Sequence, residues 1–467
     1  MHLLELPLEI FHAILAHAIP TDRSWPYDFT QLQLVNKTFA REAREVLFAT
    51  RTFRYGNCWN TLGNHYLCHR ALAPDANILY ATRTVRQTTD WIAAEQATTN
   101  WKARRSICSS LSRLATCHYR PIVHETLTES PHGVGLRERT EGLGQSSNAA
   151  EHRLCAAAYL GNMTLAQSLL SQGVDINEES DIFGLPLLSA AYGGHLKLVL
   201  FLLEKGADLN GGVIQGDTEA QRRDVGMFTS LSQGWTALEA ATAGGHEAIV
   251  RLLLDSNIGT SYYSSCSFFT AIIHAARWGR KNILQILLDR ADFAAIPEDL
   301  KTGILDTAAS ESASNGRIDT LTLLLDAGAQ VNRWEKLQDG PLWYAAINGQ
   351  NEVIKVLLER GADIDEGCLR PRDSPLVMAA HYGFPRTVAL LLDRGAEVND
   401  TKGMRPLRYI GTTSPHWCVL KVMLEKGVHK RDEEAAADVL EDAYNEDRQD
   451  LVDLLLEYGV TLSDTAE

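Results

Sequence analysis

The stretch LPLLSAAYGGHLKLVLFLLEKGADLN (185–210) contains a pattern that returns elsewhere in the chain. Two later stretches, PLWYAAINGQNEVIKVLLERGADID (341–365) and PLVMAAHYGFPRTVALLLDRGAEVN (375–399), share its Pro-Leu start, its alanine pair, its first glycine and its Gly-Ala-acid end. Where consecutive copies are clear, the glycine of that end recurs every 32 to 34 residues. A sustained period of this length predicts a stack of repeats.

Each repeat can be interpreted as two short helices. The small pair Ala190 and Ala191 lets a first helix approach its neighbours closely, and Gly194 ends that helix. The following LKLVLFLLEK (196–205) has a broad apolar face, and Gly206 can adopt the left-handed conformation that ends a helix. Because one repeat cannot bury its apolar face alone, neighbouring repeats must supply the core.

This pattern resembles the ankyrin repeat. The resemblance implies an all-α fold in which an ankyrin-repeat α-solenoid occupies residues 151–463. We expect about nine repeats, of which the fifth, eighth and ninth fit the pattern least well. The ninth is strongly polar, as expected of a terminal repeat that faces water. The repeats start near His152, Leu185, Trp235, Thr270, Lys301, Pro341, Ser374, Arg405 and Ala435.

A long insertion, residues 211–234, interrupts the array between the second and third repeats. Insertions in repeat arrays map to loops on one face, and long loops are often functional or disordered. The insertion is therefore either a tolerated loop or a loop that contacts a partner.

The composition suits a folded protein that is too long for a single core. The chain has 467 residues, of which 45% are hydrophobic, and its net charge is −15. This acidity argues against broad binding to nucleic-acid backbones. No apolar run is long enough to span a membrane. The eight cysteines are scattered without a Cys-x-x-Cys pair, so we expect reduced thiols in the cytoplasm, the nucleus or both.

The opening stretch LLELPLEIFHAIL (3–15) raises the question of a signal peptide. Glu5 and Glu9 lie within it and no Lys or Arg precedes Arg23, so a secretion signal is rejected. A second helical region follows at residues 31–51. Together these short helices carry more large aliphatic residues than so small a module can bury, which favours a protein-binding surface.

The opening module, residues 1–50, resembles the F-box, the adaptor-binding module of cullin–RING ubiquitin ligase receptors. The resemblance implies that a Skp-type adaptor contacts the L-P-x-E-I…I-L part and the later L-V-N-K-x-F part. The alternative is that these helices only cap the repeat array. The implied adaptor-binding residues are Leu6, Pro7, Glu9, Ile10, Ile14, Leu15, Leu34, Val35 and Phe39.

Between the opening module and the repeats, we expect a helical segment at 51–125, possibly with one strand, and a flexible polar linker at 126–150 that lets the two parts move relative to each other. The helical segment holds the only local basic density of the chain. We interpret this density as a solvated helix face rather than a nucleic-acid site. Its members are Lys102, Arg104, Arg105, Arg113 and Arg120, with Trp101 and Tyr119 nearby.

The sequence offers no catalytic or metal-binding motif. The spacings among Cys58, His65, Cys68, His69, Cys117, His118 and His124 match no zinc framework. No nucleophile-elbow, zinc-protease, phosphate-loop or dinucleotide motif occurs, and neither a RING nor a catalytic cysteine domain is recognisable. We therefore expect a non-catalytic protein without a metal or other cofactor.

A target protein is expected to bind along the hairpin tips and the two residues that follow each alanine pair, because these line the binding groove in the ankyrin family. Aromatic and Arg side chains are common interface anchors. The alternative is that each ring packs against the neighbouring repeat. The predicted target-binding residues are Tyr159, Tyr192, Trp278, Tyr382, Phe183, Trp235, Trp334, Arg370 and Arg372.

These expectations lead to a functional hypothesis. The chain is expected to be a monomeric substrate-recognition subunit of a cullin–RING (SCF-type) ligase, whose F-box binds the Skp-type adaptor and whose repeats bind a protein target. The alternative is an interaction scaffold without a ligase role. The sequence identifies no target.

Overall fold

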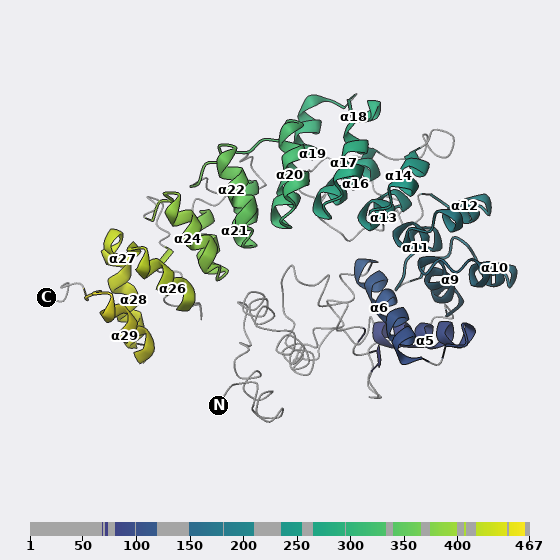
Figure 1. Cartoon of the computed structure of the whole chain (residues 1–467), viewed down its shortest axis with the longest axis horizontal. Coiled ribbons are helices and arrows are strands. Elements are labelled where there is room, and N and C mark those ends of the chain that lie inside the picture. The colour runs from purple at the N-terminus through teal and green to yellow at the C-terminus, as the bar shows by residue number, and fades with distance from the viewer. Residues whose placement is uncertain are drawn as a thin grey trace. The chain divides into compact units, whose positions relative to one another are not determined.

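Figure 1 shows the computed structural model of the chain as a succession of α-helices. The structure describes residues 68, 71–72, 80–98, 100–118, 149–180, 182–209, 235–254, 265–294, 296–332, 340–365, 374–398, 406–407, 417–445 and 448–462. Within these ranges the regular structure is helical, apart from one isolated antiparallel bridge between Ser180 and Gly184. The expected all-α class is therefore confirmed for the described residues.

Several predictions concern residues outside these ranges. They are the F-box-like module at 1–50, the polar linker up to residue 148 and the insertion at 211–234. None of the described helices is both long enough and apolar enough to cross a membrane.

The chain divides into two compact halves, residues 1–271 and 272–467. In the N-terminal half, the first helices of three repeats lie in succession, and α11 contacts both α9 and α13. Each first helix is followed by an antiparallel second helix. The pairs are α9 (Ala149–Tyr159) with α10 (Met163–Ser171), α11 (Pro186–Gly193) with α12 (Leu196–Glu204), and α13 (Ala237–Gly244) with α14 (Glu247–Leu254).

Two longer helices precede the repeats, α5 (Tyr80–Glu95) and α6 (Trp101–His118). They pack against each other and both contact α9. The Arg153 guanidinium lies 5.1 Å from the centre of the Trp91 ring, which adds a cation–π contact between α9 and α5. α5 and α6, which precede the predicted linker, are therefore packed against the first repeat through their apolar faces.

Lys102, Arg104, Arg105 and Arg113 lie on exposed and half-buried positions of α6, whereas Tyr119 and Arg120 lie outside the described residues. Arg104 forms an ion pair with Asp90 at 2.5 Å, and the Arg105 guanidinium lies 5.1 Å from the centre of the Trp101 ring, which is 58% exposed. These positions agree with the interpretation of a solvated helix face.

The C-terminal half continues the helix pairs. α19 contacts α21, and α21 contacts α23, so first helices again pack on first helices. The helices are α16 (Ser265–Arg277, which crosses the boundary between the halves), α17 (Lys281–Leu288), α18 (Ala291–Ala294), α19 (Glu298–Ser314), α20 (Ile318–Asp326), α21 (Pro341–Ile347), α22 (Asn351–Glu359), α23 (Pro375–His381), α24 (Pro385–Asp393), α26 (Trp417–Glu425), α27 (Val428–Arg431), α28 (Glu433–Asn445) and α29 (Gln449–Glu457).

Local sequence signals explain where these helices begin and end. Proline occupies the first turn of α11, α21 and α23, where its missing N–H would have no helical partner anyway. Gly194 ends α11 in the left-handed conformation, with φ +84°. The alanine pairs are fully buried between neighbouring first helices, as the small-residue interpretation requires.

α13 begins with a buried capping box. The Glu239 backbone N–H donates to the Thr236 hydroxyl, and the Thr236 backbone N–H donates to the Glu239 carboxyl at 3.0 Å. Glu239 is only 6% exposed, and this burial raises the pKa of its carboxyl to about 8. The carboxyl is therefore largely protonated near neutral pH.

Asparagine side chains join successive hairpins. The Asn177 amide donates to the carbonyl of Gly206 at 3.1 Å and accepts from the Asp208 N–H at 2.8 Å. In the other half, Asn332 makes the same pair of bonds to Gly361 and Asp363. The final asparagine of GVDIN (173–177) and of GAQVN (328–332) thus connects its repeat to the backbone of the next.

Candidate interaction surface

The ends of the first helices carry a recurrent pair of residues that we call the helix-end stripe. It consists of the two residues between the small-residue pair and the following glycine in each repeat. In the N-terminal half the stripe is Tyr159–Leu160, Tyr192–Gly193 and Ala243–Gly244. In the C-terminal half it is Arg277–Trp278, Ser314–Asn315, Ile347–Asn348 and His381–Tyr382.

In the N-terminal half, the stripe is built from aromatic rings that contact one another across repeats. The Tyr159 and Tyr192 rings stack with centres 5.8 Å apart and planes at 16°. The Trp235 ring meets Tyr192 edge-on at 6.1 Å. Both tyrosines are half-buried, whereas Trp235 is only 7% exposed. These rings therefore pack against neighbouring repeats, as the alternative interpretation of the sequence expects. Tyr159 and Tyr192 nevertheless keep part of their surface accessible.

Phe183 is predicted to contact a target, but its side chain is fully buried. It meets the His152 ring edge-on at 6.0 Å, and Nδ1 of His152 lies 2.8 Å from the Ser180 hydroxyl. Phe183 is therefore a core residue of the hairpin between α10 and α11, and the prediction that it contacts a target is wrong. Trp235 is likewise too buried to present a ring face. The sequence alone does not distinguish an aromatic residue that is buried at a hairpin tip from one that is exposed there to contact a target.

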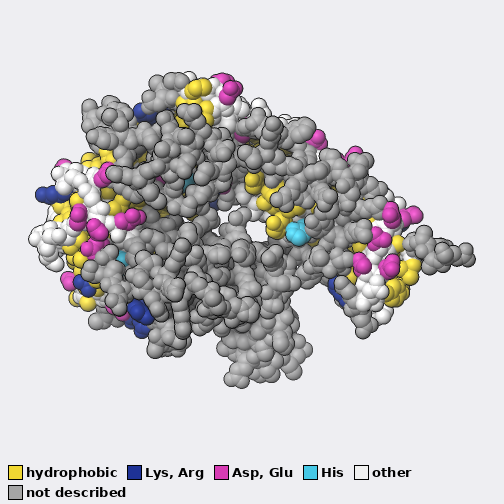
Figure 2. Space-filling model, turned by 180° about the vertical axis from the view of Figure 1, so that it is seen from behind, with side chains coloured by type: hydrophobic (Ala, Val, Ile, Leu, Met, Phe, Trp, Pro, Cys, Tyr) yellow, Lys and Arg dark blue, Asp and Glu magenta, His cyan; other side chains and the backbone are white. Residues whose placement is uncertain are grey.

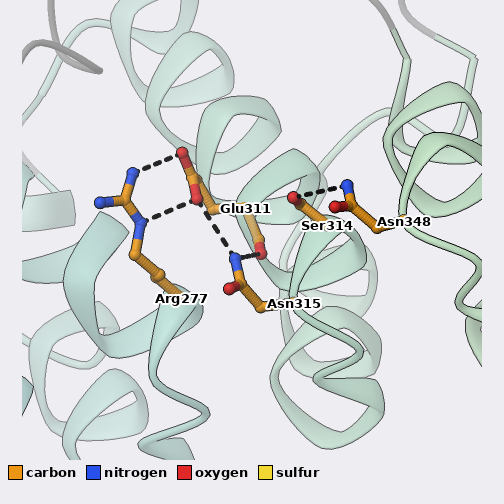
Figure 3. A network of polar contacts seen from close by, with 5 residues as sticks. All are labelled: Arg277, Glu311, Ser314, Asn315 and Asn348. Atoms are coloured by element: carbon orange, nitrogen blue, oxygen red, sulfur yellow. Dashed lines mark hydrogen bonds and ion pairs between the residues drawn. The ribbon is translucent and has the colours of Figure 1, made fainter. Parts of the chain in front are cut away.

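In the C-terminal half, the stripe includes polar side chains that form hydrogen bonds across repeats, as Figure 3 shows. Nε of Arg277 donates to one carboxylate oxygen of Glu311 at 2.8 Å, and a terminal guanidinium nitrogen donates to the other at 2.6 Å. The two side chains are 13% and 17% exposed, so this bidentate pair is largely shielded from water. The Asn315 amide also donates to the Glu311 backbone carbonyl at 2.8 Å.

The network extends into the next repeat. The Asn348 amide donates to the Ser314 hydroxyl at 3.0 Å (Figure 3). It also donates to the Tyr344 carbonyl at 2.8 Å. The sequence pattern misses Glu311, Ser314 and Asn315, because the fifth repeat departs from the alanine-pair pattern. Gly316, with φ +70°, is the available signal, since it ends this repeat's first helix as Gly349 ends the next.

The remaining stripe residues differ in accessibility. Tyr382 is 43% exposed and its ring lies 5.1 Å from that of His381, which is also exposed. Trp278 is half-buried, and its Nε1 is buried without a hydrogen-bond partner in the described part of the chain. Tyr382 is thus the most accessible described residue of the predicted target-binding set. Trp334, Arg370, Arg372 and all nine predicted adaptor-binding residues lie outside the described residues.

Among the described residues, no group of three or more His, Cys, Asp or Glu side chains is placed to hold a metal ion. The described stripe instead offers half-buried rings, a shielded ion pair and amide groups. Surfaces of this composition contact polypeptides through aromatic and hydrogen-bonding groups.

Comparison with known proteins agrees with the repeat geometry. Models of ankyrin repeats in three copies match residues 214–297 and 296–368, a model of ankyrin repeats in many copies matches 154–203, and the single ankyrin repeat matches 372–402. The chain contains ankyrin repeats. These matches begin at residue 154, so they do not test the F-box-like module.

Several ankyrin-repeat proteins are similar to parts of the chain. The ankyrin repeat, SAM and basic leucine zipper domain-containing protein 1 of Dasypus novemcinctus is 32% identical over 33% of this chain and 34% of its own length. The human ankyrin repeat and KH domain-containing protein 1 is 37% identical over 21% of this chain and 4% of its own length. The ankyrin repeat domain-containing protein SAT10 of Stachybotrys chartarum is 27% identical over 30% of this chain and 7% of its own length.

Among solved structures, the human ASB11 ankyrin repeat domain covers 58% of this chain and 96% of its own, at 22% identity and a TM-score of 0.31. This chain spans about a third or less of the curated relatives named above.

Proposed function

We propose that this chain is a non-catalytic substrate-recognition subunit of a cullin–RING ubiquitin ligase. Residues 1–50 would bind a Skp-type adaptor, and the ankyrin repeats would bind a protein target. The observation that carries the proposal is the L-P-x-E-I opening (Leu6–Ile10) on the same chain as a repeat array with an aromatic and polar stripe. The complex would act in the cytoplasm, the nucleus or both.

The proposed mechanism is proximity. A chain with one site for the adaptor and another for the target raises the effective concentration of the target near a charged ubiquitin-conjugating enzyme. No reacting group is required from the chain itself. Its contribution is to fix which protein is presented and for how long.

The proposed target surface is the helix-end stripe. Tyr382 provides exposed ring surface in the C-terminal half, and the half-buried Tyr159 and Tyr192 do so in the N-terminal half. The bidentate Arg277–Glu311 pair holds the neighbouring side chains in a fixed arrangement, which reduces the entropy lost when a target binds.

The first experiment tests adaptor binding. Purified full-length chain is mixed with a recombinant Skp-type adaptor, beside the double variant Leu6→Asp/Ile10→Asp and a control variant, Leu200→Asp. Leu200 is 38% exposed on α12, so its replacement introduces the same charge far from residues 1–50 in sequence. Binding by the wild type and the control but not by the double variant supports the proposal. No binding by the folded wild type overturns it.

The second experiment identifies the target. A photo-crosslinking amino acid at Tyr382 is compared with the same group at Leu200 in cells that contain the full chain. A protein captured only from position 382 is a target when its ubiquitylation also falls in cells carrying Leu6→Asp/Ile10→Asp. Capture without any change in ubiquitylation would favour the second candidate below.

The second candidate is an interaction scaffold without a ligase role. The packing of α5 and α6 on α9 favours it, because helices that precede the repeats then serve to cover the exposed end of the first repeat. Adaptor binding separates the two candidates.

A further inference from the structure

Two buried cysteines that are far apart in the sequence meet at α6. Cys68 lies ahead of α5 and is 7% exposed, whereas Cys108 lies on α6 and is fully buried. The Cys108 thiol donates to the backbone carbonyl of Cys68 at 3.7 Å, and the Cys68 sulfur lies 4.0 Å from the carbonyl oxygen of Arg105. The two thiols also form a hydrogen bond with each other. Their sulfur atoms are therefore already in contact in the folded chain.

The surroundings of the two thiols favour different protonation states. The hydrogen bond from Cys108 and the nearby Arg105 guanidinium stabilise the Cys68 thiolate and lower the pKa of Cys68, although burial acts in the opposite direction. The same contact with Cys68, together with burial, raises the pKa of Cys108. Cys68 is thus the thiol that ionises first, and it is also the one of the two that keeps some accessible surface.

α5 and α6 form a basic part of an acidic chain. Their sequences hold six Lys or Arg against two Asp or Glu, although the whole chain has a net charge of −15. Figure 2 shows Lys and Arg side chains on the described surface of these two helices, at its lower left. Because positive charge favours a thiolate over a thiol, this part of the fold supports an ionised Cys68.

Cys155 shows the chemistry of a buried cysteine in a different setting. Its thiol donates to the Gly184 carbonyl at 3.1 Å, and burial raises its pKa. Burial against the hairpin between α10 and α11 thus keeps this thiol protonated, and a protonated thiol is a poor nucleophile. Burial alone therefore does not explain the environment of Cys68, which combines a thiol donor with a cation.

We propose that Cys68 and Cys108 form a reversible oxidation site, at which hydrogen peroxide converts the two thiols into a disulfide. In the first step, the Cys68 thiolate attacks one oxygen of the peroxide. The O–O bond breaks, Cys68 becomes a sulfenic acid, and the departing hydroxide leaves as water with the proton that Cys68 released.

In the second step, the Cys108 sulfur attacks the Cys68 sulfur. The S–S bond forms, the S–O bond breaks, and the second hydroxide leaves as water with the Cys108 proton. Two thiols are thus oxidised while one peroxide is reduced to two waters. A dithiol reductant reverses the reaction by thiol–disulfide exchange.

The disulfide connects the chain ahead of α5 to α6. Cys68 and Cys108 are 40 residues apart, so the bond closes a loop that contains α5 and the first part of α6. Because α5 and α6 pack against each other and against α9, the bond holds together the helices that precede the repeats. This site is separate from the helix-end stripe and does not depend on the proposed ligase role.

The test exposes the reduced full-length chain to a graded series of hydrogen peroxide concentrations. Peroxide is small enough to reach a sulfur atom with little exposed surface, whereas a maleimide is not, so the remaining thiols are blocked only after denaturation. A digest without reductant is then read by mass spectrometry. We expect a Cys68–Cys108 peptide pair that is lighter by two hydrogens and is lost on addition of dithiothreitol. It should form at least about tenfold faster than Cys155 loses its thiol.

Variants separate the two steps. In Cys108→Ser the Cys68 sulfenic acid has no thiol at position 108 to attack it, so a dimedone adduct should appear at Cys68. In Cys68→Ser, the Cys108 thiol should survive the same treatment. Cys155→Ser is the matched control, because it removes a buried thiol elsewhere and should leave the Cys68–Cys108 disulfide unchanged. Thermal melting of the reduced proteins confirms that each variant is folded.

Three results would overturn the proposal. They are the absence of a Cys68–Cys108 disulfide in the folded wild type when Cys155 is already consumed, a disulfide of either residue with one of the other six cysteines instead, and a cross-link that forms only in denaturant. The oxidised wild type should also melt at a higher temperature than the reduced protein, and Cys108→Ser should show no such rise. A disulfide without this rise would overturn its role in holding α5 and α6 together.

Discussion

Nε2 of His195 lies 2.9 Å from the backbone carbonyl oxygen of Tyr159, one repeat earlier, so this nitrogen carries the proton and donates it. His246 makes the same bond to Tyr192 at 3.0 Å. In the C-terminal half, Arg317 and Gln350 take the same position and reach back to the carbonyls of Arg277 and Ser314. In these four repeats, the residue just before the second helix thus connects its repeat to the one before.

The His246 ring packs directly against Gly194, which leaves no room for a side chain at that position. Gly194→Ala should therefore disturb this connection between repeats. A methyl group on Gly194 would overlap the His246 ring, and Gly194 has φ +84°. Gly206 has φ +91°, but a methyl group added there would meet no atom within 4 Å, so Gly206→Ala isolates the backbone cost. We expect Gly206→Ala to lower the free energy of unfolding by about 1–2 kcal/mol and Gly194→Ala to lower it by clearly more. Denaturant unfolding measures both, and equal losses would contradict the role of the ring.

The Arg277–Glu311 pair should stabilise the folded state more than an exposed ion pair does. Its geometry is bidentate and its side chains are 13% and 17% exposed. A double-mutant cycle with Arg277→Ala and Glu311→Ala should give a coupling energy of about 1–3 kcal/mol. The exposed pair Lys355–Glu352 is the control and should give about 0.5 kcal/mol or less. Similar couplings for the two pairs would show that burial does not strengthen the first.

Burial of Glu239 predicts a pH dependence of stability. The folded state holds the pKa near 8, above the ordinary 4.5, so between these values the folded state binds more protons than the unfolded state. Stability therefore falls as pH rises through this window, by at most about 1.4 kcal/mol per pH unit from this group. Glu239→Gln keeps an acceptor for the Thr236 N–H and cannot ionise.

The melting temperatures of wild type and Glu239→Gln should therefore differ least near pH 5 and diverge in favour of the variant towards pH 8. A constant difference across this range would mean that the carboxyl does not titrate in it.

Thiol labelling should separate the described cysteines. Cys418 is exposed, whereas Cys68, Cys108 and Cys155 are buried. Burial raises the pKa of Cys155, and its thiol donates to the Gly184 carbonyl at 3.1 Å. A maleimide pulse on native protein, read by peptide mass spectrometry, should modify Cys418 first and the other three only in denaturant. Early modification of Cys155 would contradict the burial of its thiol against the hairpin between α10 and α11.

The sequence predicted the helix pairs well because their signals are local. Proline at the first turn of α21 and glycine after its end act through the backbone of adjacent residues. The fifth repeat was expected to fit poorly, yet α19 ends at Ser314 and is followed by Gly316 in the same conformation as its counterparts. Its departure lies in the alanine pair, where Ser312 and Ala313 are both buried and small enough to pack.

By itself, the sequence determined the repeat period, the helical class and the positions of the helix-ending glycines, since each depends on residues close together in the chain. The tertiary structure decided which side chains are accessible. Phe183 is buried, Tyr382 is exposed, and Tyr444 occupies a position where earlier repeats hold a buried alanine. Exposure depends on whether another repeat, about 33 residues away, packs over the side chain, and no local pattern encodes that.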